Sequence, residues 1–310
     1  MRPELLQAAQ LIQRNTPESM EEAVGLLQRT VYSFSMKVCG HPQDAEDTTQ
    51  EVLFRSLNHL AKIHDPQALA VWLYTVTRNR CWRMRRKPAN SSARTLSLDD
   101  LMPDDAELNR LLQDNSPGPE DTALHAEQHQ LLHKAVLAIP APLRIVLVLH
   151  DMEELTTEEV AQVLGLQPGT VRVRLHRARL AVRREMSRVL EEASSAAKHA
   201  KAAVAAPRAP KRAAAQHPKR PAACRELFAS LSEYLDGRVE PRACSQMASH
   251  IEGCPSCVAF LRDLRAAIDR CRSLDVPCDP KVAARLRSTL TRELRRLTSP
   301  SPAEKISARV

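Results

Sequence analysis

Thr157 to Arg179 reads TEEVAQVLGLQPGTVRVRLHRAR, and this stretch predicts two short helices separated by a tight turn. In its first half, apolar residues recur at helical spacing up to Leu164. Gly165 follows, and glycine readily adopts the left-handed backbone conformation in which many helices end. Pro168 starts the second helix, because proline is well tolerated in a first helical turn. The pattern is that of a helix-turn-helix.

The second helix of this pair has one apolar and one basic face. Its apolar stripe, at helical spacing, consists of Val171, Leu175, Ala178 and Val182. The opposite face carries Arg172, His176, Arg177 and Arg179, with Arg174 at its flank. A helix with such a face can reach base edges and phosphates in a DNA groove. The alternative is a solvated basic face on an ordinary helical hairpin.

Composition indicates several small helical domains. The chain has 310 residues, of which 43% are hydrophobic, only 3% are aromatic and 7 are glycine. This balance favours helical bundles over β-sandwiches and barrels, so we predict an all-α fold. The net charge of +8 permits a nucleic-acid partner without identifying one. The first residues, MRPELLQAAQ, lack the apolar segment of a signal peptide, and we expect a cytoplasmic protein without a membrane partner.

Three helices are predicted in the N-terminal part, over Met20–Cys39, from Asp44, and after Pro66. The third contains Trp72, Tyr74 and Trp82, followed by a cluster of Lys and Arg. Aromatic faces stack on bases while arginines hold the phosphate backbone, so this helix is predicted to bind single-stranded DNA. In the alternative, Trp72 lies in the core and Trp82 caps it.

Composition shifts divide the chain into six parts. Acidic, proline-containing sequence predicts a linker, and Ala-rich, basic, low-complexity sequence predicts a tether. The predicted parts are a helical domain at 1–87, the acidic linker at 88–128, the helix-turn-helix domain at 129–190, the tether at 191–223, a cysteine-containing helical domain at 224–298, and a disordered tail at 299–310.

The first and third parts resemble the extracytoplasmic-function sigma factors of bacterial RNA polymerase. DAEDTTQEV and AVWLYTVTRNRCWRMRR are similar to the second conserved region of that family. AIPAPLRIVLVLHDMEELTTEEVAQVLGLQPGTVRVRLHRARLAVR is similar to its fourth region. The resemblance extends from about Met20 to Leu190.

This resemblance implies partners and site residues. Core RNA polymerase is expected to bind Asp47, Gln50 and Glu51. The opened minus-ten strand of promoter DNA is expected to meet Asn79 and its neighbours Arg78, Arg80 and Arg83. The minus-thirty-five duplex is expected to meet Thr170, Arg172, Arg174, His176, Arg177 and Arg179.

Four of the 8 cysteines lie between Cys224 and Cys257. His250, Cys254 and Cys257 are spaced so that an imidazole and two thiolates can converge on a zinc ion at a helix junction. Cys224, on an apolar helical stripe, is predicted to be the fourth ligand, and Cys244 is the alternative. Four protein ligands would hold one zinc per chain in a closed shell without a catalytic water. In another interpretation these are buried free cysteines beside an unrelated histidine.

This cysteine-containing part resembles zinc-binding anti-sigma factors, from Cys224 to about Leu297. In that family the same Cys and His-x3-Cys-x2-Cys set binds zinc, and in its redox-sensing members thiol oxidation expels the metal and releases the sigma factor. Cys271 and Cys278 are additional thiols here. Cys271 lies on an apolar helical stripe and is expected to be buried.

Together these features predict a sigma factor, not an enzyme, that carries its own regulatory zinc domain and contacts that domain intramolecularly. Two alternatives within this class are a metal-sensing domain, responding for example to copper or zinc, and a passive zinc-stabilised module for protein interactions. A zinc hydrolase is disfavoured because the sequence contains no His-Glu-x-x-His motif.

Overall fold

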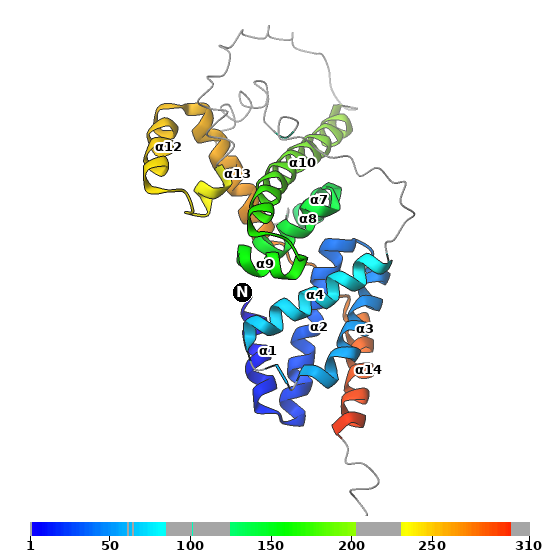
Figure 1. Cartoon of the computed structure of the whole chain (residues 1–310). Coiled ribbons are helices and arrows are strands. Elements are labelled where there is room, and N and C mark those ends of the chain that lie inside the picture. The colour runs from blue at the N-terminus through cyan, green and yellow to red at the C-terminus, as the bar shows by residue number, and fades with distance from the viewer. Residues whose placement is uncertain are drawn as a thin grey trace, which may run out of the picture. The chain divides into compact units, whose positions relative to one another are not determined.

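The structure is a computed structural model that describes residues 2–60, 62–63, 65–84, 101, 125–202 and 231–298. All regular elements in these ranges are helical, as the composition predicts (Figure 1). The helices are α1 (Pro3–Arg14), α2 (Pro17–Cys39), α3 (Pro42–Leu60), α4 (Pro66–Met84), α7 (His125–Ala138), α8 (Ala141–Leu147), the π-helical turn η1 (Val148–Met152), α9 (Thr157–Leu164), α10 (Pro168–Ala202), α12 (Pro241–Gly253), α13 (Pro255–Ser273) and α14 (Pro280–Thr298).

Proline and local capping set many of these boundaries. Most of the helices begin at a proline, whose missing N–H costs nothing in a first turn. Before α2, the Thr16 hydroxyl accepts a hydrogen bond from the Ser19 backbone N–H, and Ser19 reciprocates. After α2, Gly40 adopts a φ of 77° and ends the helix.

The chain forms two compact units, and unit 1 comprises Met1–Ser92, Val148–Val171 and Asp275–Val310. In unit 1, α2 packs on α1, α3 and α4, and α4 also packs on α9. The rings of Phe34 and Tyr74 lie 4.9 Å apart between their centroids. Buried side chains from all four N-terminal helices form this core, including Leu5, Leu27, Phe34, Leu53, Leu69 and Tyr74.

The C-terminal helix α14 is also part of unit 1. Its leucines at i, i+4 and i+8 are buried, and α14 packs along α2 and α3 (Figure 1). Gln28 Nε2 donates a hydrogen bond to the Ala283 carbonyl at 3.0 Å, and Arg285 pairs with Glu46. The predicted boundaries group this helix with the zinc motif, whereas its extensive contacts are with α2 and α3. The leucines are Leu286, Leu290 and Leu294.

Unit 2 comprises Ala93–Leu147 and Arg172–Leu274. α12 packs on α13 there, with Phe260, Leu264 and Ile268 of α13 buried. Helix α10 continues to Ala202, beyond the predicted domain end at Leu190, because the Ala-rich sequence that follows has high helix propensity. The rest of the predicted tether, most of the acidic linker and the tail lie outside the described residues.

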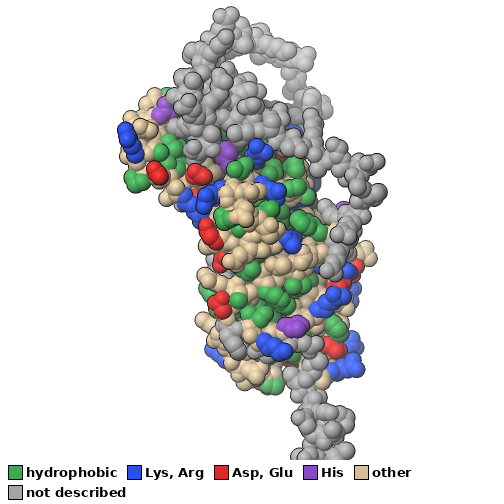
Figure 2. All heavy atoms as spheres, in the orientation of Figure 1, with side chains coloured by type: hydrophobic (Ala, Val, Ile, Leu, Met, Phe, Trp, Pro, Cys, Tyr) green, Lys and Arg blue, Asp and Glu red, His purple; other side chains and the backbone are tan. Residues whose placement is uncertain are grey.

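Some hydrophobic side chains reach the surface of unit 1. Figure 2 shows them in green on one face, between scattered charged groups. The large exposed ones in this unit are Leu6, Phe54 and Trp82. None of the described helices combines the length and apolar character that a membrane crossing requires.

Candidate metal centre and nucleic-acid interface

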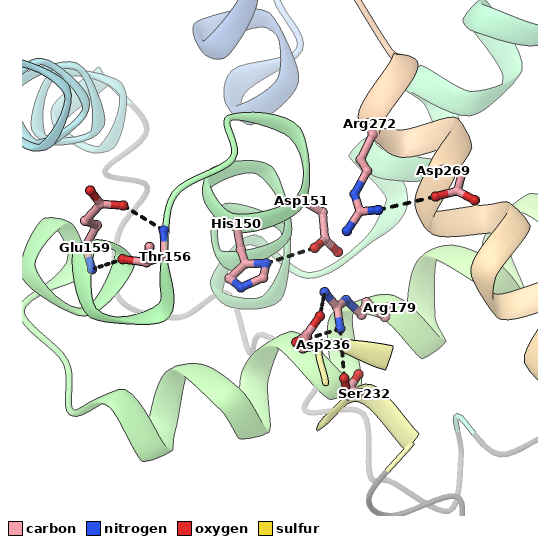
Figure 3. Close-up of polar contacts among 9 residues, drawn as sticks. All are labelled: His150, Asp151, Thr156, Glu159, Arg179, Ser232, Asp236, Asp269 and Arg272. Atoms are coloured by element: carbon pink, nitrogen blue, oxygen red, sulfur yellow. Dashed lines mark hydrogen bonds and ion pairs between the residues drawn. The ribbon is translucent and has the colours of Figure 1, made fainter. Parts of the chain in front are cut away.

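The helix-turn-helix is built by strong local signals. At the start of α9, the Thr156 hydroxyl accepts from the Glu159 backbone N–H at 3.2 Å (Figure 3). The Glu159 carboxylate accepts from the Thr156 N–H at 2.7 Å, which completes a capping box. Gly165 ends α9 with a φ of 66°, and α10 starts at Pro168. Both predicted helices and the turn between them are confirmed.

The apolar stripe predicted for α10 is buried at every position, from Val171 to Val182. Thr170 and Arg172 are exposed, and Arg174 and Arg177 are half-buried. These four side chains, all in the expected DNA-binding set, remain reachable from solvent in this conformation.

Arg179, expected on the exposed basic face, is instead buried, with 1% of its surface accessible. Its guanidinium forms a two-point ion pair with Asp236, at 2.8 Å (Nη2 to Oδ1) and 3.1 Å (Nη1 to Oδ2) (Figure 3). Nη1 also donates to the Ser232 carbonyl at 3.3 Å. A planar guanidinium matches a carboxylate well, so this pair is specific in geometry as well as charge.

A second buried arginine on α10 makes a similar contact. Arg183 Nη1 lies 3.1 Å from Asp263 Oδ2, and its guanidinium carbon lies 4.6 Å from the centre of the Phe260 ring. A guanidinium over an aromatic face gains a cation–π attraction that strengthens when water is excluded. Asp236, Phe260 and Asp263 all belong to the predicted cysteine-containing domain.

His176 was also expected to face DNA, but only 8% of its surface is accessible. Burial and the neighbouring charges of Arg179 and Arg177 lower its pKa to about 4, so the ring is neutral at neutral pH. Within the described residues, neither ring nitrogen has a hydrogen-bond partner. His176 lies one turn before Arg179, and the two side chains are buried on the same side of α10.

The expected polymerase-binding side chains lie on α3. Asp47 and Gln50 are exposed, and Glu51 is half-buried. Glu51 pairs with Arg55 at 2.9 Å and with Arg80 at 2.6 Å. The structure thus brings together one residue expected to bind polymerase and one expected to bind DNA.

The expected strand-binding residues lie near the end of α4. The Asn79 side-chain oxygen accepts a hydrogen bond from Arg78 Nε at 3.1 Å. The Arg78 guanidinium lies over the exposed ring of Trp82, 4.9 Å from its centre. The side chain of Arg83 lies outside the described residues. Of the other aromatics in this helix, Trp72 is half-buried, and Tyr74 is fully buried and cannot stack on a base.

Three predicted zinc ligands meet at the junction of α12 and α13. His250 is in the last turn of α12, Cys254 is the residue between the helices, and Cys257 is in the first turn of α13. Their ligand atoms all lie within 4.8 Å of one another, with His250 Nε2 and Cys257 Sγ 3.5 Å apart. In a tetrahedral zinc site, ligand atoms are separated by about 3.3–3.8 Å. The side chains therefore fit a zinc ion after small adjustments.

The remaining cysteines differ in their surroundings. Cys224 lies outside the described residues, and Cys244 is half-buried and is not part of the three-ligand group. Cys271 is buried as expected. Cys278, near Tyr32 in unit 1, has its pKa raised to about 11 by burial and by the charges of Glu46 and Asp279, so this thiol is a weak nucleophile.

Sequence reasoning missed the acidic partners of α10 and a buried charge cluster in unit 1. Asp236 and Asp263 carry no local signal, because their partners are distant in sequence. The cluster consists of Arg2, Lys37, Tyr74 and Glu153. Its one sequence signal is Lys37, a charge placed within the apolar pattern of α2, which requires a buried partner.

Three family models match this chain. They are sigma-70 region 2 over residues 23–90, sigma-70 region 4 over residues 129–182, and a putative zinc-finger over residues 224–257. The region 4 match contains the helix-turn-helix, and the zinc-finger match contains the three converging ligands.

Curated relatives agree with these matches. A probable RNA polymerase sigma factor, RfaY of Xanthomonas campestris, is 31% identical over 163 residues, which cover 51% of this chain and 38% of that protein. The extracytoplasmic-function sigma factor SigW of Bacillus subtilis is 25% identical over 56% of this chain and 92% of its own length. The sigma-H factor of Pseudomonas aeruginosa is 27% identical over 60% of this chain and 96% of its own length. The chain therefore contains sigma-70 regions 2 and 4 followed by a putative zinc-finger domain, and the relatives that it resembles include extracytoplasmic-function sigma factors.

Proposed function

We propose that this protein directs core RNA polymerase to specific promoters and that its C-terminal zinc domain inhibits it in cis. Thr170, Arg172, Arg174 and Arg177 are accessible on α10, which supports their contact with the minus-thirty-five duplex. Asp47 and Gln50 are accessible on α3, which supports polymerase binding there. Asn79 and the arginines beside it are proposed to meet the opened minus-ten strand.

The observation that carries the inhibitory role is the burial of Arg179. A charged side chain on a DNA-binding helix is 99% removed from solvent and satisfied by Asp236, from the segment that follows the tether. Arg183 and Asp263 repeat the arrangement one turn further along. An arginine held in this way is unavailable to a phosphate. Attachment in one chain gives the zinc domain an effective concentration of roughly millimolar, so individually weak contacts suffice for inhibition.

The zinc site is proposed to hold one ion through His250, Cys254, Cys257 and Cys224. A bound zinc ion would fix the angle between α12 and α13 and would contribute folding free energy in a domain this small. The zinc-finger match starts at Cys224 and ends at Cys257, which supports Cys224 as the fourth ligand.

Thiol oxidation is the proposed releasing signal. Cys254 and Cys257 lie at the start of α13, where the helix dipole favours thiolates. Two thiolates transfer two electrons to hydrogen peroxide. An S–S bond forms, the O–O bond breaks, and uptake of two protons gives two waters. The proposed disulfide, from Cys224 to Cys254 or Cys257, removes two sulfur ligands, and the packing of α12 on α13 loses its support.

Run-off transcription with core polymerase tests both roles. The reduced full-length chain is compared with a truncation at Leu190, and then with full-length chain treated with peroxide or a chelator. We expect the truncation and both treated samples to be more active than the reduced full-length chain. Equal activity of that chain and the truncation would exclude inhibition in cis. Activation by copper or cadmium without a response to peroxide would favour a metal sensor, and no response to any treatment would favour a passive module.

A further inference from the structure

A buried carboxylate joins four segments of unit 1. Glu153, between η1 and α9, is fully buried. Its Oε1 accepts from Lys37 Nζ of α2 at 2.9 Å, and its Oε2 accepts from Tyr74 Oη of α4 at 2.7 Å. Arg2 Nε lies 3.2 Å from Oε2 and donates to the Met152 carbonyl at 3.0 Å. Both oxygens of the carboxylate are thus satisfied by donors from elements far away in the sequence.

The Lys37 charge can stay buried only while the Glu153 carboxylate is beside it. Lys37 is as fully buried as Glu153, and an isolated charge in such a place is strongly unfavourable. Burial, followed by the Glu153 charge, raises the pKa of Tyr74 well above its usual range, so its hydroxyl remains a donor. If Glu153 leaves, Lys37 must become hydrated, which requires the surrounding helices to separate.

The backbone around Glu153 is unusual on both sides. The preceding turn is π-helical, and the Glu153 N–H bonds to the Val148 carbonyl at 2.9 Å. The following residue, Glu154, has a backbone φ of 57°, which residues other than glycine seldom adopt. π-Helical turns and left-handed residues occur frequently at functional positions. Here they direct Glu153 towards its three donors.

The four residues come from different functional regions. Glu153 is within the region 4 match, while Lys37 and Tyr74 are within the region 2 match. We propose that Lys37 and Tyr74 of region 2, together with Arg2 before it, form a carboxylate receptor that binds Glu153 of region 4 and holds the protein in a closed state that cannot span a promoter. This inference rests on the proposed sigma-factor function.

The geometry of DNA explains why the contact must open. Elements at minus ten and minus thirty-five are about 25 base pairs apart, or roughly 85 Å along the duplex axis. Region 2 and region 4 cannot occupy both elements while the Glu153 carboxylate remains within 3.2 Å of side chains on α2, α4 and the N-terminus. This closure involves no residue of the zinc domain, so it would act in addition to inhibition by that domain.

Hydrogen–deuterium exchange of the full-length chain tests the receptor. E153Q keeps the shape of the side chain and removes its charge. We expect the amides of 148–164 to exchange at least about tenfold faster in E153Q than in the wild type, with α3 unchanged. E154Q is the matched control, because Glu154 is exposed, and its exchange should equal that of the wild type. Unchanged exchange in E153Q would refute the receptor.

A second variant guards against general unfolding. K37M/E153M removes both charges and leaves apolar side chains of similar length, so no charge is left buried alone at Lys37. We expect α3 to stay as protected as in the wild type, while the amides of 148–164, which lack the receptor contact, exchange faster. If E153Q loses protection throughout unit 1, faster exchange confined to 148–164 in K37M/E153M still supports the receptor, and exchange there as slow as in the wild type refutes it.

Transcription then tests the consequence. At limiting protein, E153Q is expected to give severalfold faster run-off transcription than the wild type, and E154Q is expected to match the wild type. Faster exchange without faster transcription would refute the closed state as an inhibitory one. Absence of promoter-directed transcription from every variant and from the truncation at Leu190 would refute the sigma-factor function instead, which distinguishes the two failures.

Discussion

Asp236→Ala should release α10 from the C-terminal domain. Asp236 supplies both carboxylate contacts to the Arg179 guanidinium, which is 1% exposed, while Asp236 itself is 15% exposed. Removing one partner of a buried ion pair costs about 3–5 kcal/mol, because the other charge stays buried. Since Asp236 is partly hydrated, we take the lower end, about 3 kcal/mol, which corresponds to roughly a hundredfold change in an equilibrium constant.

The assay is fluorescence anisotropy with a labelled minus-thirty-five duplex and the full-length chain. In the wild type, the form in which Asp236 pairs with Arg179 competes with DNA binding. Lowering the equilibrium constant of that form by a given factor lowers the apparent Kd for DNA by at most the same factor. We expect D236A to bind up to about a hundredfold more tightly. The control is D269A, since Asp269 and Arg272 form an exposed pair on α13 that should contribute less than about 1 kcal/mol.

Two further measurements make the result interpretable. Native mass spectrometry should find the same zinc content in D236A and wild type, because Asp236 is not a ligand. Circular dichroism should show equal helix content. With both satisfied, an unchanged Kd would show that the Arg179–Asp236 pair does not restrict α10, and the reasoning from burial would be wrong.

Four other predictions concern separate contacts. L290A deletes a fully buried side chain of α14 at a cost of about 2–5 kcal/mol, so amide exchange in α14 should accelerate, and equal exchange would contradict its packing on α2 and α3. In native mass spectrometry, C224S should carry less than one zinc ion per chain, while C244S should retain one. The reverse result would make Cys244 the fourth ligand in place of Cys224. R172A should weaken duplex binding by about 1–3 kcal/mol in the truncated chain, whereas unaltered anisotropy would remove Arg172 from the interface. The pKa of His176 is lowered to about 4 in the folded chain, so the unfolded chain binds more protons between about pH 6.5 and 4. The free energy of unfolding should therefore decrease as pH falls through that window, by at most about 3 kcal/mol. H176L should abolish this part of the decrease in denaturant titrations at pH 7, 5.5 and 4.5.

Local signals in the sequence mark most of the helices, although α1 (Pro3–Arg14) was not predicted and α2 begins three residues before the predicted Met20. Pro17, Pro66 and Pro168 each begin a helix, and Gly40 and Gly165 each end one in the left-handed conformation. The zinc triad was predicted for the same reason. His250, Cys254 and Cys257 are separated by a single helix junction, so short-range geometry alone brings them together.

Predictions that depended on a helical wheel were less complete. A wheel identifies the face of α10 that is not apolar, but it cannot tell solvent from an acidic partner. Arg179 and His176 are on that face and are nevertheless buried. Arg179 pairs with a residue 57 positions away in the sequence, and Arg183 pairs with one 80 positions away. Lys37 and Glu153 are separated by 116 residues, a pairing that no local pattern specifies.

The packing of α14 on α2 gives newly synthesised protein a different surface from mature protein. The Gln28 to Ala283 hydrogen bond joins residues 255 positions apart. At a ribosomal rate of about 5–20 residues per second, Gln28 is synthesised roughly 13–51 seconds before Ala283. During that interval Tyr32, Met36 and Ala45 lack the cover of Val276, Cys278 and Val282. Each new molecule therefore passes through a stage of synthesis in which α2 and α3 exist without their C-terminal cover, and a partner present at that stage meets a surface that α14 covers in the mature protein.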